Sequence, residues 1–134
     1  MGAWAEDAFG NDTACDWVGD FAEDPNLDII ATAIEQVIEA DYIDSDIASE
    51  CLVACEIVAR LNGNWGERSA YSESIDVWVE SSKIKPSENL ISNAKIAITK
   101  ILGENSELQE LWDEDGKNEK WHQEMNDLLL RVVS

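Results

Sequence analysis

The chain has 134 residues, 45% of them hydrophobic, and a formal net charge of −20 at pH 7. A chain of this length can bury a core as one domain, but so acidic a surface disfavours binding to nucleic acid or anionic lipid, which both need basic side chains. Since it shows neither an apolar run long enough to span a membrane nor a secretion signal, we expect one cytoplasmic domain over residues 1–134.

The charge is distributed unevenly along the chain. The first 59 residues contain fifteen Asp and Glu and no Lys or Arg, whereas all nine basic residues lie at or after Arg60. One interpretation is that the acids keep the protein soluble through mutual repulsion. The other is that the first 59 residues form a docking face for a basic protein, and composition leaves both open.

The N-terminal stretch is rich in aromatic residues, although chain ends are usually polar. Asn11 or Asp12 can cap a short helix there. The helical spacing of its apolar residues places them on one face: Ala14, Trp17, Val18 and Phe21. Because so short a helix needs a covered face to persist, we predict that Trp4 and Phe9 form an ordered arm that tucks under it.

Two longer helices are predicted next. The first begins after Pro25 and runs to about Asp41 with a wide apolar stripe. After the short connection DYIDSD, Asp44 or Ser45 caps the second helix, which stops at Gly63. The brief connection predicts that the two helices lie antiparallel.

The second half of the chain predicts shorter helices. The irregular stretch NGNWGERSAYSES is punctuated by glycine, and a short amphipathic helix follows from about Ser72. Ser87, Ser106 and Asn118 can begin three further helices. No strand pattern competes with these helices, so we expect an all-α fold, a compact single-domain bundle of about six or seven helices.

Few residues have a spacing suited to catalysis or metal binding. Cys51 and Cys55 lie four apart on one apolar stripe, which favours small buried hydrophobes over a redox or metal site. His122 is the only histidine and has no Ser or Cys within one helical turn to activate. Calcium loops, zinc spacings and phosphate-binding glycine loops are absent from the sequence. We therefore expect no catalytic residue, no metal and no cofactor.

Candidate partner contacts come from the acidic first half of the chain. Asp41, Asp44, Asp46 and Glu50 cluster around one predicted helix turn and could form an acidic face for a basic protein. Trp65, in the irregular stretch, could anchor a partner because tryptophan is enriched in binding hot spots. The alternative is that Trp65 folds back onto the body of the protein as an apolar plug.

The start of the chain carries a set of motifs in a fixed order: Met1-Gly2-Ala3-Trp4, Phe9, Asn11-Asp12, Ala14 and Asp16-Trp17. This set resembles the signature of the bacterial family called domain of unknown function 4259, and the blocks EADY and NSELQELW resemble its later motifs. Family members often have glycines where Ala5 and Asp7 stand here. The resemblance implies that the aromatic start is the native N-terminus and belongs to the fold, and it carries no activity.

Three functions remain open on the sequence. The leading hypothesis is a small acidic protein-binding module, most concretely an immunity protein that neutralises a basic toxin such as a nuclease. The main alternative is a non-catalytic regulatory or scaffold domain. The third is an enzyme or small-ligand protein with a pocket between helices.

Overall fold

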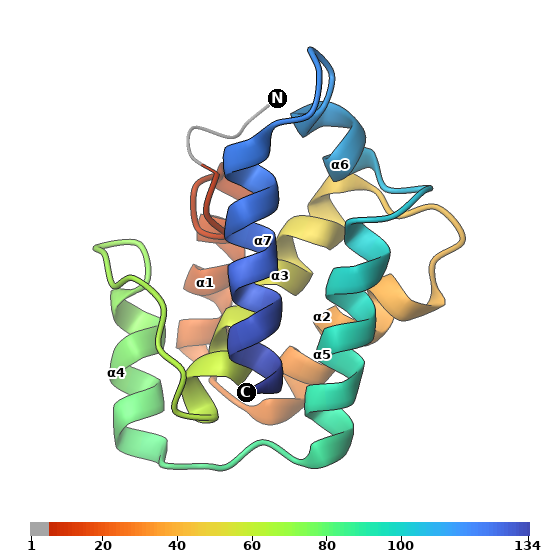
Figure 1. The fold of residues 1–134 in the computed structure, drawn as a ribbon. Helices are drawn as coiled ribbons and strands as arrows, with labels where there is room; N and C mark the ends of the chain where they lie inside the picture. The colour runs from red at the N-terminus through yellow and green to blue at the C-terminus, as the bar shows by residue number, and fades with distance from the viewer. Residues whose placement is uncertain (1–5) are drawn as a thin grey trace.

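The computed structural model describes residues 6–134, and this part of the chain folds into seven helices (Figure 1). They are α1 (Asp12–Glu23), α2 (Leu27–Glu39), α3 (Ser45–Leu61), α4 (Glu73–Ser82), α5 (Glu88–Ile101), α6 (Glu107–Trp112) and α7 (Glu119–Val133). The only strand-like pairing in residues 6–134 is an isolated bridge between Ile43 and Ser106. The prediction of an all-α bundle of six or seven helices is confirmed.

Helix starts follow the capping residues in the sequence. The side chains of Asn11, Asn26 and Asp44 each accept a hydrogen bond from a backbone N–H in the first turn of α1, α2 or α3. Three more side chains do the same for α5, α6 and α7: Ser87, Ser106 and Asn118. Such bonds satisfy backbone donors that the helix itself leaves free, which explains why the predicted and observed starts agree closely.

Helix α3 lies at the centre of the bundle and packs against each of the six other helices. Every residue from Cys51 to Leu61 is buried, on all sides of the helix. This stretch is apolar almost all round apart from Glu56 and Arg60, and a helix of that kind is stable only when it is enclosed. The chain reverses direction between α2 and α3 (Figure 1), as the short connection predicted.

The arm before α1 is packed over the part that the structure describes. Ala8 and Phe9 are buried in the core, and the backbone oxygen of Phe9 accepts a hydrogen bond from the Cys15 thiol. The burial predicted for Phe9 is therefore confirmed. Trp4, the other aromatic residue of the predicted arm, lies outside the described residues.

No helix within residues 6–134 has the length and apolar character needed to cross a bilayer.

The stacked pair of Trp112 and Trp121, whose ring centroids lie 6.3 Å apart, joins α6 to α7. Trp121 is fully enclosed and Trp112 packs against the same core.

We predict that Cys51 and Cys55 resist thiol reagents in the folded protein. Both are buried, and burial raises the pKa of the Cys55 thiol well above its ordinary value, which disfavours the reactive thiolate. With Cys15→Ser as the background, a maleimide should label neither thiol without denaturant and both in strong denaturant, as read by mass spectrometry. Rapid labelling of both in the native state would contradict the packing of α3.

Candidate functional site

The acidic residues predicted to contact a partner lie at the N-terminal end of α3 and in the loop before it. Asp41 and Asp44 are exposed in that loop, and Asp46 is exposed in the first turn of the helix. Asp44 also caps α3, accepting from the backbone N–H of Ile47 at 2.9 Å. We call Asp41, Asp44, Asp46 and Glu50 the acidic cluster.

Glu50 is the least exposed member of the acidic cluster. Burial raises the pKa of its carboxyl, and the negative charges of Asp46, Asp44 and Asp20 raise it further. A carboxyl with a raised pKa holds its proton more readily because the surroundings disfavour its charge. A cation brought next to Glu50 would relieve this repulsion, so the cluster is suited electrostatically to a positively charged ligand.

The backbone beneath the acidic cluster is held in place by α6. The N–H of Ile43 donates to the oxygen of Asn105 at 2.8 Å, and the N–H of Glu107 donates to the oxygen of Ile43 at 2.9 Å. The Glu107 carboxylate accepts from the N–H of Ser45 at 2.7 Å. From the other side, the Asp46 carboxylate accepts from the Thr13 hydroxyl of α1 at 2.9 Å. The acidic cluster is thus presented on a braced loop.

Lys100 of α5 also reaches this region of the molecule. Its ammonium donates to the backbone oxygens of Ile38 and Ala40, at 2.8 Å and 3.0 Å. These carbonyls lie at the C-terminal end of α2, where a cation is favourable. Lys100 therefore caps a helix, and within residues 6–134 its ammonium forms no ion pair with the acidic cluster.

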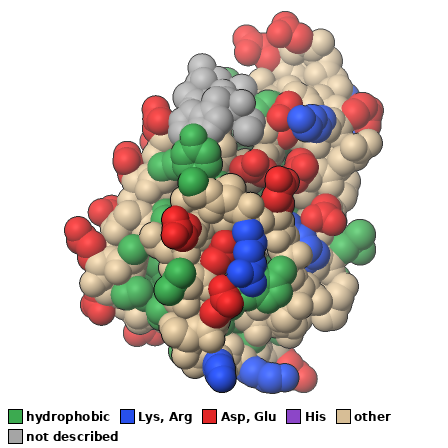
Figure 2. All heavy atoms as spheres, turned by 90° about the vertical axis from the view of Figure 1, so that its left-hand side faces the viewer, with side chains coloured by type: hydrophobic (Ala, Val, Ile, Leu, Met, Phe, Trp, Pro, Cys, Tyr) green, Lys and Arg blue, Asp and Glu red, His purple; other side chains and the backbone are tan. Residues whose placement is uncertain are grey.

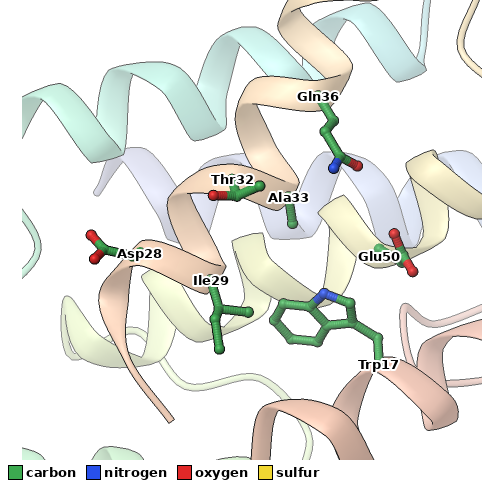
Figure 3. Close-up of a pocket in the computed structure, with 7 residues that line it drawn as sticks. All are labelled: Trp17, Asp28, Ile29, Thr32, Ala33, Gln36 and Glu50. Atoms are coloured by element: carbon green, nitrogen blue, oxygen red, sulfur yellow. The ribbon is translucent and has the colours of Figure 1, made fainter. Parts of the chain in front are cut away.

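A shallow groove of about 250 Å³ adjoins the cluster, between α1, α2 and α3. Figure 3 shows Trp17 of α1 directed toward α2, with Glu50 of α3 beside its ring and Asp28 at the far end. Ile29 and Ala33 supply apolar lining from α2. We call this the Trp17 groove.

Trp17 was predicted on the apolar face of α1, and it does pack against the core, but part of its ring stays accessible in the groove. One face stacks on Phe21, with centroids 5.3 Å apart, and Phe21 meets the edge of Trp78 on α4 at 5.2 Å. This aromatic row fixes the Trp17 ring. Sequence reasoning missed Trp17 as a surface residue because periodicity identifies the apolar face but not how far a neighbouring helix covers it.

Trp65 lies beyond the other end of α3, which at 17 residues is about 25 Å long. Its ring is half-buried against the core, and the Arg68 guanidinium lies 3.8 Å from the ring centroid. The structure therefore does not bring Trp65 together with the acidic cluster. Its ring is already engaged by cations of this chain, Arg68 and, at 5.7 Å, Arg60.

A buried network of charges surrounds the C-terminal half of α3. The Arg60 side chain is 0% exposed and donates to the carboxylates of Glu56 and Asp76 and to the backbone oxygen of Glu67. Arg131 of α7 donates through both terminal nitrogens to Glu56, at 2.8 Å and 3.0 Å. Glu56 therefore pairs with two guanidiniums, and the network joins α3 to α4, α7 and the irregular segment.

A second pocket, of about 420 Å³, lies over this network. Arg131 lines it together with five carboxylates: Asp7, Glu56, Glu67, Glu124 and Asp127. Burial and these acidic neighbours raise the pKa of Glu124.

The side of the molecule that carries α1 and α4 is shown in Figure 2, where Lys and Arg side chains stand among the Asp and Glu.

The comparisons with known proteins give one result. The model of the family called domain of unknown function 4259 matches residues 2–124. The chain belongs to this family. No curated protein and no solved structure matches it.

The match to domain of unknown function 4259 covers α1 to α6 and the start of α7. It includes the acidic cluster, the Trp17 groove and Trp65, and it stops before Asp127 and Arg131. The family description assigns no activity to any of these residues. Their possible roles therefore follow from their geometry alone.

In this member of the domain of unknown function 4259, His122 pairs with Asp113, whose carboxylate oxygen lies 2.8 Å from the imidazole Nε2. Burial would raise the pKa of Asp113, but the N–H of Asn118 and the imidazole outweigh it and lower that pKa. The pair closes the turn between α6 and α7. Among the described residues, no group of three or more His, Cys, Asp or Glu is placed to hold a metal ion.

Proposed function

We propose that this chain is an acidic binding protein whose partner is a basic protein. The observation that carries the proposal is the absence of Lys and Arg from the first 59 residues, which build α1, α2 and most of α3. The most concrete form of this function is an immunity protein that neutralises a basic toxin, such as a nuclease, by covering its surface.

The encounter of two proteins and the lifetime of their complex have different physical causes. Opposite charges raise the rate at which two proteins meet and orient them before contact. Apolar and aromatic groups that become buried afterwards supply most of the lasting affinity. The acidic cluster provides the first property, and the accessible part of Trp17 beside it provides the second.

We propose no catalytic role, metal or cofactor for the chain. His122 is paired with Asp113 and lies edge-on to Trp121, an arrangement that braces α6 against α7. A regulatory or scaffold protein would use the same acidic face with a partner that is not a toxin. The pocket over the Arg60 network supports a third function, binding of a small ligand, because its volume lies within the usual range for such sites.

Affinity capture from the native host, followed by reconstitution with the purified partner, tests the proposal. We expect a basic protein that binds the chain at low salt and dissociates as salt rises, because screening shortens the reach of the charges. An immunity protein should also abolish the partner's toxic activity, whereas a scaffold protein should not. Repeated capture of no basic protein, or binding of the purified candidate that is insensitive to salt, would overturn the proposal.

A further inference from the structure

The Trp17 groove has the size of a side-chain site. Its volume of about 250 Å³ falls below the roughly 300–1,000 Å³ that is typical of small-molecule sites. It is open to the surface between α1 and α2, so a side chain carried by another protein can enter it. The groove therefore fits one long side chain better than a free metabolite.

The lining of the groove combines an apolar wall with free acceptors at its two ends. Trp17 and Ile29 form the wall, the Glu50 carboxylate stands beside the Trp17 ring, and Asp28 lies at the far end with its carboxylate directed away from that ring (Figure 3). Within residues 6–134, neither carboxylate takes part in a hydrogen bond or an ion pair. The same holds for the amide of Gln36 at the groove's upper edge. These groups remain available to a ligand.

Arginine is the side chain that matches this combination. Its planar guanidinium stacks on an indole ring and donates two parallel hydrogen bonds to one carboxylate, whereas the lysine ammonium is a strongly hydrated point charge. Its aliphatic stem can lie along apolar surface such as Ile29. The protein itself shows this mode of contact elsewhere, since the Arg68 guanidinium lies 3.8 Å from the centre of the Trp65 ring.

We propose that the Trp17 groove receives one arginine side chain of the basic partner, which stacks on Trp17 and pairs with Glu50. This inference rests on the proposed function and names the partner group that the groove takes. Negative charge nearby adds to the match, because Asp46 and Asp44 of the acidic cluster lie close enough to Glu50 to influence its ionisation.

The test is a titration with the blocked tripeptide acetyl-Gly-Arg-Gly-amide, followed by NMR. The Trp17→Phe variant assigns the indole N–H signal of Trp17 among the six tryptophans. We expect a saturable shift of this signal, a weaker response to the lysine tripeptide, and none to the neutral citrulline tripeptide. Glu50→Gln should weaken the arginine response about tenfold, since a hydrogen bond to a charged group is lost.

The matched control is Glu80→Gln, which removes an exposed carboxylate of α4 that pairs with Arg68 of the irregular segment. It should leave the titration unchanged. The inference is overturned if the Trp17 signal does not move at tens of millimolar tripeptide, if citrulline acts as arginine does, or if Glu50→Gln has no more effect than Glu80→Gln.

Failure of this inference and failure of the proposed function can be told apart. If a basic partner is captured but Trp17→Phe and Glu50→Gln leave its affinity intact, the function stands and the groove is not the contact. If no basic partner is captured, the proposed function fails whatever the tripeptide does. A circular-dichroism melt of each variant shows whether it is folded before binding is measured.

Discussion

Replacing Glu56 by alanine should destabilise the protein by about 3–5 kcal/mol, the usual cost of removing one partner from a buried ion pair. Glu56 is the only carboxylate that bonds both Arg60 and Arg131 in the described chain. Its removal leaves the Arg60 guanidinium, which is 0% exposed, with Asp76 as its remaining carboxylate partner. For a domain with a typical unfolding free energy of about 5–15 kcal/mol, this is a large share.

Urea unfolding followed by circular dichroism measures this effect. The matched control is Glu80→Ala, which breaks the ion pair with Arg68, a pair about half exposed on both sides. Exposed pairs of this kind contribute about 0–1 kcal/mol. If Glu56→Ala lowered the unfolding free energy no more than Glu80→Ala does, the buried network would not hold the bundle together.

The helices could be predicted because their signals are local. A capping side chain and the first-turn N–H that it accepts from lie three residues apart, as in Asn11 with Ala14 and Ser87 with Leu90. Apolar spacing over a few turns then gives the buried face of each helix. Both signals are contained in a short stretch of sequence, and neither depends on the rest of the fold.

The central position of α3 and its charge network could not be predicted in the same way. Arg60 pairs with Asp76, which lies 16 residues away in the sequence, and Arg131 pairs with Glu56, which lies 75 residues away. Periodicity within one helix does not specify partners so far away. The sequence does not mark Arg60 and Glu56 as buried, because charged side chains are usually exposed. Their burial follows once six helices surround α3.

The candidate site also has one part that local sequence signals predict and one part that depends on contacts between helices. Asp44, Asp46 and Glu50 could be grouped from sequence because they share the first turns of one helix. The Trp17 groove needs α2 to approach α1 and α3, which no local pattern shows. For Trp65 the sequence left two interpretations, an anchor for a partner and an apolar plug folded back onto the protein. In the structure its ring is half-buried under Arg68, because it packs against core residues outside its own segment.

The acidic cluster should act mainly on how fast a basic partner binds. Replacing Asp41, Asp44 and Asp46 by asparagine removes three charges with little change in shape. Steering by charge changes association rates by roughly 10–1,000-fold in total, so we expect the triple variant to associate about tenfold more slowly at low salt. Its dissociation rate should change little, because desolvated contacts hold the complex once it has formed.

The folded state of the triple variant should be almost unaffected. Asparagine caps a helix about as well as aspartate does at position 44, and its side-chain oxygen can still accept from the Thr13 hydroxyl at position 46. The matched control neutralises three exposed acids outside the first 59 residues: Glu73→Gln, Glu88→Gln and Glu114→Gln. Stopped-flow or surface-plasmon measurements with the purified partner then compare two proteins of equal net charge.

Salt gives the decisive comparison between these variants. The Debye length falls from about 30 Å at 0.01 M to about 3 Å at 1 M ionic strength, so the wild-type and triple-variant association rates should converge as salt rises. The control variant should stay closer to wild type throughout, because its three removed charges belong to α4, α5 and the turn after α6 and not to the acidic cluster. Equal association rates for the wild type and the triple variant at low salt would mean that the acidic cluster serves solubility and does not guide a partner.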